Sequence, residues 1–219
     1  MARQSVSPVV DSASVAGYVT AGGQSKRFGQ DKALATLGGE VMLARMCRLV
    51  TDATGSATIV ADRHRPYSTF GVPVVEDLWS GEGPLGGIVT ALLATEKRSP
   101  ACAWNLIVSC DMPFLTREFL AHLAARALAS PALAVVPQSA HGREPLCACW
   151  RTSAAGELQA AFAGGMRRVN DALKHLQAEV LDEADWKRFD SAGTLFWNMN
   201  TASDHEEAQR ILAGSNRRE

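Results

Sequence analysis

The chain has 219 residues, of which 47% are hydrophobic and 21% charged, and its formal net charge at pH 7 is −1. These values are ordinary for a globular domain that buries a sizeable core. They give no sign of a partner such as nucleic acid or an anionic membrane surface. No apolar stretch approaches the roughly 18 residues that a membrane-spanning helix needs. Five cysteines scattered from Cys47 to Cys149 do not form a disulfide framework, which favours a reducing cytoplasm.

Short apolar runs alternate with helical patterns along the chain. In chain order we expect a strand at 15–21, a helix at 40–53, strands at 57–61 and 72–76, a helix at 83–97, a strand at 104–109, a helix at 117–129 capped by Thr116, strands at 132–137 and 145–150, helices at 153–163 and 168–176, a strand at 179–182 and a helix at 201–213. This alternation predicts an α/β fold with a mostly parallel central sheet and helices on both faces. Residues 1–14 are expected to be a flexible tail and residues 15–219 a single domain, because no repeat, low-complexity tract or clear linker interrupts them.

A glycine-rich loop, T-A-G-G-Q-S-K-R-F-G-Q-D-K-A-L at Thr20–Leu34, follows the first expected strand. It is not a P-loop, because no Lys-Ser or Lys-Thr pair follows Gly29. It is not the dinucleotide-binding fingerprint either, because Gly22 and Gly23 are adjacent where that motif spaces its glycines. Neither of these two familiar phosphate motifs is therefore present.

The loop nevertheless has the chemistry of a phosphate site. Glycines after a strand let backbone N–H groups approach an anion closely. Ser25 adds a hydroxyl donor, and Lys26, Arg27 and Lys32 supply positive charge. The alternative is a plain strand-to-helix turn whose glycines take positive φ and whose cations are solvated.

The complete loop, A-G-G-x-S-x-R-F-G-x-D-K-A-L, resembles the signature of the nucleotidyltransferase superfamily, and within it the molybdenum cofactor guanylyltransferases of the MobA type. Further motifs in the family's order are V-V-E-D at Val74–Asp77, G-P-L-G-G-I at Gly83–Ile88, S-C-D-M-P-F at Ser109–Phe114, E-P-L at Glu144–Leu146 and W-N-M-N-T at Trp197–Thr201. The resemblance covers about residues 16–213. It implies a Rossmann-like nucleotidyltransferase fold. It also implies transfer of GMP from GTP to the terminal phosphate of molybdopterin, with release of pyrophosphate and formation of the guanine dinucleotide cofactor.

The resemblance assigns roles to individual residues. The implied catalytic residues are Arg27, Lys32 and Asp111. The implied nucleotide-binding residues are Thr20, Ala21, Gly22, Gly23, Ser25, Lys32, Asp62, Asp77 and Gly86. Asp62 departs from the family, which usually has Asn at this position, so its role stays open. For Asp77 the alternative is an ordinary solvated carboxylate.

Asp111 is the expected Mg²⁺ ligand. It lies just beyond an apolar strand, where open α/β sheets bind their ligands, and Mg²⁺ prefers carboxylate, phosphate and water oxygens. The alternative is a loop Asp that caps the turn before Pro113. The glycine loop and the family's magnesium aspartate at this place favour the metal ligand.

The resemblance puts the acceptor next to Arg143, Glu144, Asn198 and Asn200. We expect the two asparagines to alternate in a short strand, so that both amides face one side, although amides at such a place also bind nearby backbone. Cys147 and Cys149 share a face of another expected strand. No second pair or histidine cluster has zinc-site spacing, so core packing is favoured for them.

Three alternatives to the guanylyltransferase remain. One uses CTP on the same pterin; such relatives tend to read A-A-G where this chain has Ala21–Gly23. Another uses GTP on a different phosphorylated acceptor. A third, of another class, is a nucleotide-binding sensor without turnover, against which Arg27, Lys32 and Asp111 together argue. The expected partners are the two substrates and other cofactor-biosynthesis proteins or molybdoenzyme chaperones, with no nucleic acid and no membrane.

Overall fold

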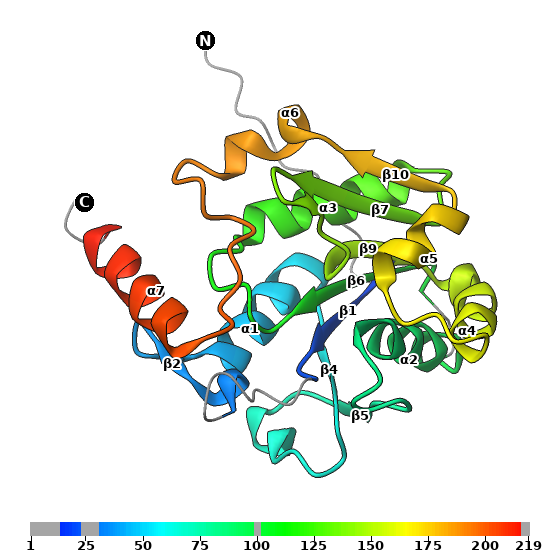
Figure 1. Ribbon diagram of the computed structural model, residues 1–219, viewed down its shortest axis with the longest axis horizontal. Coiled ribbons are helices and arrows are strands. Elements are labelled where there is room, and N and C mark those ends of the chain that lie inside the picture. Colours follow the sequence, from blue (N-terminus) through cyan, green and yellow to red (C-terminus); the bar gives the residue numbers. More distant parts are fainter. Residues whose placement is uncertain (1–13, 23–30, 99–101, 216–219) are drawn as a thin grey trace.

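The central feature of the fold is a mixed sheet that helices cover on both faces (Figure 1). The structure is a computed structural model that describes residues 14–22, 31–98 and 102–215. Of the tail expected over residues 1–14, only Ser14 therefore lies within the described part. None of the described helices is long and apolar enough to cross a membrane.

The sheet has the strand order β10-β7-β9-β6-β1-β4-β5, and β8 pairs with β7 beside this path. Its strands are β1 (Val15–Thr20), β4 (Thr58–Ala61), β5 (Val74–Glu76), β6 (Trp104–Ser109), β7 (Ala134–Ser139), β8 (Gly142–Arg143), β9 (Cys147–Arg151) and β10 (Ala178–Leu181). The pairs β6-β1, β1-β4, β4-β5 and β10-β7 are parallel, whereas β9 is antiparallel to both of its neighbours. The chain returns from β7 to β9 through a short connection, which permits only antiparallel pairing. The prediction of a mostly parallel sheet is confirmed.

Helices α1 (Met42–Thr54) and α3 (Arg117–Ala129) cover one face, and α2 (Pro84–Glu96), α4 (Ala155–Ala163) and α5 (Val169–His175) cover the other. Alternate residues of β1 belong to the two cores: Val15 and Val19 pack with α1 and α3, and Tyr18 with α2. This is the period of two that a strand buried on both faces requires. The sheet therefore holds the carboxyl ends of β1, β4, β5 and β6 rigidly at one edge.

A single glycine allows α1 to approach the sheet. A Cβ at Gly17, in the middle of β1, would lie 2.3 Å from the Ser56 carbonyl oxygen and 2.4 Å from Val50 Cγ1. Any larger residue would push α1 and the turn that follows it away from the sheet. The end of α1 is itself typical, since Gly55 takes the left-handed conformation at its C-cap.

Some elements differ from those expected. The helix predicted over 40–53 begins at Met42, because the two residues before it pair as β3 (Glu40–Val41) with β2 (Thr36–Leu37). The short helix α6 (Glu183–Trp186) was not expected. The C-terminal helix α7 (Ala202–Ser215), red in Figure 1, lies beside the β2–β3 hairpin. Met199, Ala208 and Leu37 form a small third core between them.

Candidate active site

A cavity of about 340 Å³ opens at the carboxyl ends of the parallel strands. This is the edge at which open α/β sheets bind ligands, because the loops that leave the strands diverge there. Four residues expected to bind nucleotide line it, namely Thr20, Gly22, Asp62 and Asp77. The volume lies within the range of small-ligand pockets.

Asp77 is fixed by its own loop. Its Oδ1 accepts hydrogen bonds from the Trp79 backbone N–H (3.1 Å) and from Thr90 Oγ1 (3.2 Å). Its Oδ2 lies beside two glycines, since a Cβ at Gly22 or Gly87 would be 3.9 Å away from it. One carboxylate oxygen is thus held by the protein, while the other lies where these two glycines meet the cavity.

The structure distinguishes the two adjacent glycines at the start of α2. A Cβ at Gly86 would lie 2.9 Å from Trp79 Cβ, so Gly86 packs against the Trp79 residue, and it does not line the cavity. Gly87, whose neighbour Gly86 is the residue assigned to the nucleotide, lines the cavity with Thr20 and Asp77. A shift of one residue turns a helix position by about 100°, which is why the pattern of letters alone did not separate them.

Asp62 is held by two hydrogen bonds. Ser80 Oγ donates to its Oδ2 at 2.7 Å, and the His64 backbone N–H donates to its Oδ1 at 2.9 Å. The bond from Ser80 and then the bond from His64 lower the pKa of Asp62, so this carboxyl is ionised at neutral pH. It therefore adds a negative charge to the cavity wall where an Asn would be neutral.

A network at Asp31 was missed by sequence reasoning. Arg65 Nη1 (2.8 Å) and the Tyr67 hydroxyl (2.6 Å) both donate to Asp31 Oδ2, while Asp31 Oδ1 accepts from the Ala33 N–H. Burial and the bond to Asp31 raise the pKa of Tyr67. Arg65 also lines the cavity. These contacts tie the residue before Lys32 to the loop after β4, and no motif in that loop signalled them.

The first two residues after β1, Ala21 and Gly22, differ in their surroundings. The Ala21 N–H donates to the Val60 carbonyl at 2.9 Å, so it continues the sheet and is not available to a phosphate. Gly22 is exposed at the cavity. The other expected residues of the glycine loop, Gly23, Ser25 and Arg27, lie outside the described residues.

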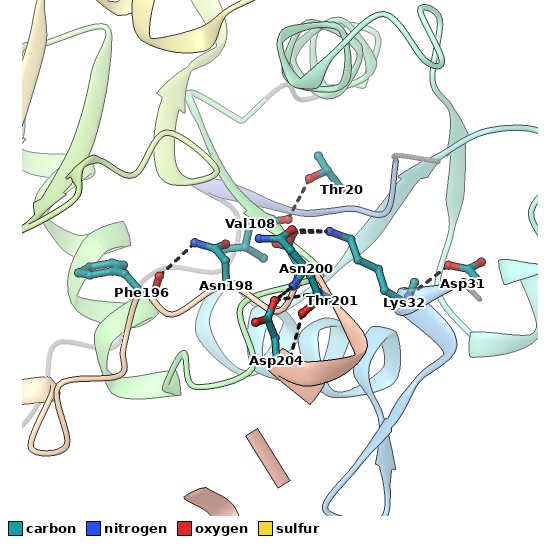
Figure 2. Close-up of polar contacts among 11 residues, drawn as sticks. Thr20, Asp31, Lys32, Val108, Phe196, Asn198, Asn200, Thr201 and Asp204 are labelled. Atoms are coloured by element: carbon teal, nitrogen blue, oxygen red, sulfur yellow. Dashed lines mark hydrogen bonds and ion pairs between the residues drawn. The ribbon is translucent and has the colours of Figure 1, made fainter. Parts of the chain in front are cut away.

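Lys32 and Asp111 meet at the centre of the site. Lys32 Nζ lies 2.5 Å from Asp111 Oδ2 and 3.5 Å from Asn200 Oδ1. Lys32 begins the short turn of 3₁₀ helix Lys32–Leu34 at the end of the glycine loop, and Asp111 lies two residues after the end of β6. Residues 79 positions apart are thus brought together, and Figure 2 shows the Lys32 side chain extending toward Asn200.

The other oxygen of Asp111 fits a metal ligand. Asp111 is only 9% exposed, and its Oδ1 is buried without a hydrogen-bond partner among the described residues. Buried polar atoms almost always have partners, so such an atom calls for an explanation. A carboxylate oxygen is a ligand that a divalent cation accepts. The residues present therefore fit a metal ion at this position.

The strand expected at Asn198 and Asn200 is absent, and that prediction is wrong. Residues 197–200 form no ladder; the Met199 N–H donates instead to the Asp111 carbonyl at 2.8 Å. Asn198 Nδ2 donates to the Phe196 carbonyl at 3.1 Å (Figure 2). The expected alternation is still present, because Met199 is buried in the third core while both asparagines are exposed.

A second cavity, of about 360 Å³, adjoins this segment. Glu144 and Asn198 line it, together with Ser139, Trp186 and Trp197. Arg143 is in β8, where it pairs with Gln138, and lines neither cavity.

The turn at Glu144–Leu146 separates the two cavities. Leu146 lines the first cavity and Glu144 the second. The Leu146 carbonyl accepts from the Ser109 N–H at 2.7 Å, which fixes the turn beside the end of β6. Ser109, two residues before Asp111, lines the first cavity only, and Asn198, two residues before Asn200, lines the second only.

Cys147 and Cys149 share one face of β9, as predicted, and both are fully buried in the core with α1 and α3. Burial raises the pKa of both thiols. Their packing accounts for them as core residues.

The chain matches the family described as "MobA-like NTP transferase domain" over residues 17–180. It is 33% identical to a molybdenum cofactor guanylyltransferase of Rhizobium rhizogenes, across 95% of this chain and 97% of that protein. A probable molybdenum cofactor guanylyltransferase of Bacillus cereus is 30% identical, across 90% of this chain and 97% of the relative.

Solved structures agree with these relatives. Molybdopterin-guanine dinucleotide biosynthesis protein A of Archaeoglobus fulgidus superposes with a TM-score of 0.75 at 25% identity, covering 90% of this chain and 98% of that one. A 2-C-methyl-D-erythritol 4-phosphate cytidylyltransferase of Thermus thermophilus, 13% identical with a TM-score of 0.63, shares the fold. The Rossmann-like nucleotidyltransferase fold is therefore confirmed, and the chain belongs to the family of MobA-like NTP transferase domains.

Proposed function

We propose that this protein transfers GMP from GTP to the terminal phosphate of molybdopterin, releasing pyrophosphate and forming the guanine dinucleotide form of the cofactor. The observation that carries the proposal is that the linings of two cavities reach residues close to one centre, Lys32 and Asp111: Ser109 lines the first cavity two residues before Asp111, and Asn198 lines the second two residues before Asn200, which contacts Lys32. A transferase needs such an arrangement, because two substrates must meet there with their reacting atoms aligned. Relatives that match this chain over nearly its whole length are named molybdenum cofactor guanylyltransferases.

GTP occupies the first cavity in this proposal. Asp77 and Asp62 lie at the ends of neighbouring strands and offer acceptors to the amino and hydroxyl groups of a nucleoside. Thr20, Gly22 and Gly87 near the start of α2 form the wall against which the ribose and phosphates lie, and Gly86, also assigned to the nucleotide, lets α2 pack closely behind that wall. The remaining residues assigned to the nucleotide are Ala21, Gly23, Ser25 and, for the phosphates, Arg27 and Lys32.

The chemistry is a displacement at phosphorus. An oxygen of the acceptor's terminal phosphate attacks the α-phosphorus of GTP and forms a new P–O bond. The bond from the α-phosphorus to the oxygen that bridges to the β-phosphate breaks, and pyrophosphate leaves with its electron pair. Both reactants are anions, so the catalytic task is positioning and neutralisation of charge, which Lys32 supplies with Arg27.

A divalent metal belongs to this site, and we propose Mg²⁺. Asp111 would hold it, because its buried Oδ1 lacks a partner among the described residues. When bound, Mg²⁺ supplies positive charge to the oxygens of the triphosphate. Lys32 holds the second oxygen of the same carboxylate and keeps it oriented.

The acceptor occupies the second cavity in this proposal. Asn198 and Glu144 line this cavity, and Asn200 contacts Lys32. Arg143, in β8 next to Glu144, is the remaining residue assigned to the acceptor. Other cofactor-biosynthesis proteins or molybdoenzyme chaperones would deliver or collect the cofactor. The proposed compartment is the cytoplasm, because all five cysteines are free thiols.

The test is to identify the product. The purified protein is incubated with molybdopterin, Mg²⁺ and GTP, CTP, ATP or UTP in turn, and the pterin products are analysed by mass spectrometry. We expect the guanine dinucleotide from GTP, with one pyrophosphate for each product. A cytosine dinucleotide from CTP alone would instead assign the chain to the cytidylyltransferase branch. Binding of GTP without any product would identify a nucleotide sensor.

A further inference from the structure

The second cavity, of about 360 Å³, has three aromatic side chains in its lining, Trp186, Phe196 and Trp197. The ring of Trp186 contacts that of Phe196 edge-on, with centroids 4.9 Å apart, and Trp186 Nε1 donates to the Gln138 carbonyl at 3.1 Å. These rings are therefore fixed before any ligand arrives, and rigid aromatic walls favour the binding of a flat ring.

Only one of the two oxygens of the Glu144 carboxylate accepts a hydrogen bond from the described residues. Ser139 Oγ donates to Glu144 Oε1 at 2.6 Å, and the other oxygen has no hydrogen bond among the described residues. Burial raises the pKa of Glu144, although the bond from Ser139 and the charge of His141 act in the opposite direction. The backbone of Glu144 is fixed as well, since its N–H donates to the Pro137 carbonyl at 2.8 Å.

Such a carboxylate requires a donor from the ligand. A partly buried carboxylate is stabilised most by two parallel N–H groups, which match its two oxygens. The pterin ring carries this pattern at one edge, where the 2-amino group adjoins the N3–H. We propose that the second cavity binds the pterin ring of the acceptor and that Glu144 determines its specificity by accepting hydrogen bonds from the 2-amino and N3–H groups. This inference rests on the proposed function and identifies the residue that recognises the acceptor ring.

The position of Glu144 agrees with this role. The Glu144–Leu146 turn separates the cavities, and Asn198 lines the second cavity two residues before Asn200, which contacts Lys32. A pterin held at Glu144 therefore extends its phosphate-bearing side chain past the asparagines toward Lys32 and Asp111. Glu144 thus binds the ring edge at one end of the acceptor, and the reacting phosphate lies at the other end.

The test measures binding of two small probes by calorimetry. Pterin has the 2-amino group, whereas lumazine has an oxygen in its place and presents an acceptor to Glu144. We expect lumazine to bind the wild-type protein about 10–100-fold more weakly than pterin, as a lost charge-assisted hydrogen bond predicts. Glu144→Gln should weaken pterin binding by a similar factor, because its amide presents N–H groups to the donors of the ring.

Glu183→Gln is the matched control, since Glu183 lines the same cavity but pairs with the exposed Lys187. It should bind pterin like the wild type. The rise in melting temperature with GTP should be the same in all three proteins, because the nucleotide lies in the first cavity. With molybdopterin as substrate, Glu144→Gln should raise the KM for the pterin and leave the KM for GTP and kcat unchanged.

Two results would overturn this inference and leave the proposed function standing. They are equal binding of pterin and lumazine to the wild type, and pterin binding that Glu144→Gln does not weaken. Absence of measurable pterin binding to the wild type would also overturn it. If Glu144→Gln does not fold, the comparison of pterin with lumazine on the wild type still decides. Failure of the wild type to transfer GMP to molybdopterin, despite binding GTP, would refute the proposed function instead.

Discussion

Replacing Lys32 with Met should reveal two separate roles of this lysine. Met keeps the length and most of the volume of the side chain but removes the ammonium that lies 2.5 Å from Asp111 Oδ2. The side chains of Lys32 and Asp111 are 16% and 12% exposed, so the carboxylate of the variant would be left nearly buried without its partner. The free energy of unfolding should fall by about 2–4 kcal/mol, because breaking one partner of a buried ion pair costs on the order of 3–5 kcal/mol.

Magnesium should partly reverse this loss. A divalent cation can replace the ammonium at Asp111, so Mg²⁺ should stabilise Lys32→Met more than it stabilises the wild type. Turnover should fall by a factor on the order of 10²–10³, because one preorganised charge no longer stabilises the transition state. The two effects separate a structural role of Lys32 from a catalytic one.

The assay is urea unfolding with and without Mg²⁺, together with pyrophosphate release from GTP and molybdopterin. Lys174→Met is the matched control, because Lys174 forms a largely exposed pair with Asp171 whose loss should cost about 0–1 kcal/mol. If Lys32→Met were as stable as Lys174→Met and released pyrophosphate at the wild-type rate, the role assigned to Lys32 would be refuted.

Three further variants test the fold and the network around the site. Gly17→Ala should lower the free energy of unfolding in urea by about 1–3 kcal/mol or more, since its Cβ would lie 2.3 Å from the Ser56 oxygen. Gly156→Ala is the control and should not lower it, because a Cβ there meets nothing within 4 Å. Tyr67→Phe removes the 2.6 Å hydrogen bond to the Asp31 carboxylate and should cost about 1.5–3 kcal/mol in the same assay. An unchanged free energy of unfolding would show that this hydrogen bond does not stabilise the fold. Burial raises the folded-state pKa of Glu144, so its contribution to stability is fully present below the ordinary glutamate pKa and is lost as the pH rises through the folded-state pKa. The stability of the wild type relative to Glu144→Gln should therefore decline over the weakly acidic range, and a difference that does not change with pH would contradict the raised pKa.

Strong local signals explain which elements the sequence predicted well. The strand Trp104–Ser109 and the helix Arg117–Ala129 have the predicted ends, because an apolar run and an N-cap at Thr116 are both local. Thr116 Oγ1 indeed accepts from the Phe119 N–H at 3.3 Å. The two-residue strands β2 and β3 carry too little periodicity to stand out.

The candidate site likewise has parts that the sequence predicts and parts that it does not. Lys32 and Asp111 could be placed together because each follows a strand whose carboxyl end lies at the same sheet edge. The Arg65 and Tyr67 contacts with Asp31 depend on how a loop after β4 folds back, which no spacing encodes. The second cavity likewise gathers residues from well-separated segments, so its aromatic lining becomes visible only in the folded chain.

The central claim is that the two cavities share one metal-dependent centre at Asp111, and a Mg²⁺ titration of guanylyl transfer tests it most directly. Asp111→Asn keeps the size of the side chain but removes the charge that attracts the metal. With GTP and molybdopterin, we expect the variant to need more Mg²⁺ and to reach a plateau lower by a factor on the order of 10²–10³, so that added metal rescues it only in part. Identical midpoints and plateaus for the wild type and Asp111→Asn would contradict the account and make Asp77 the better candidate for the metal ligand.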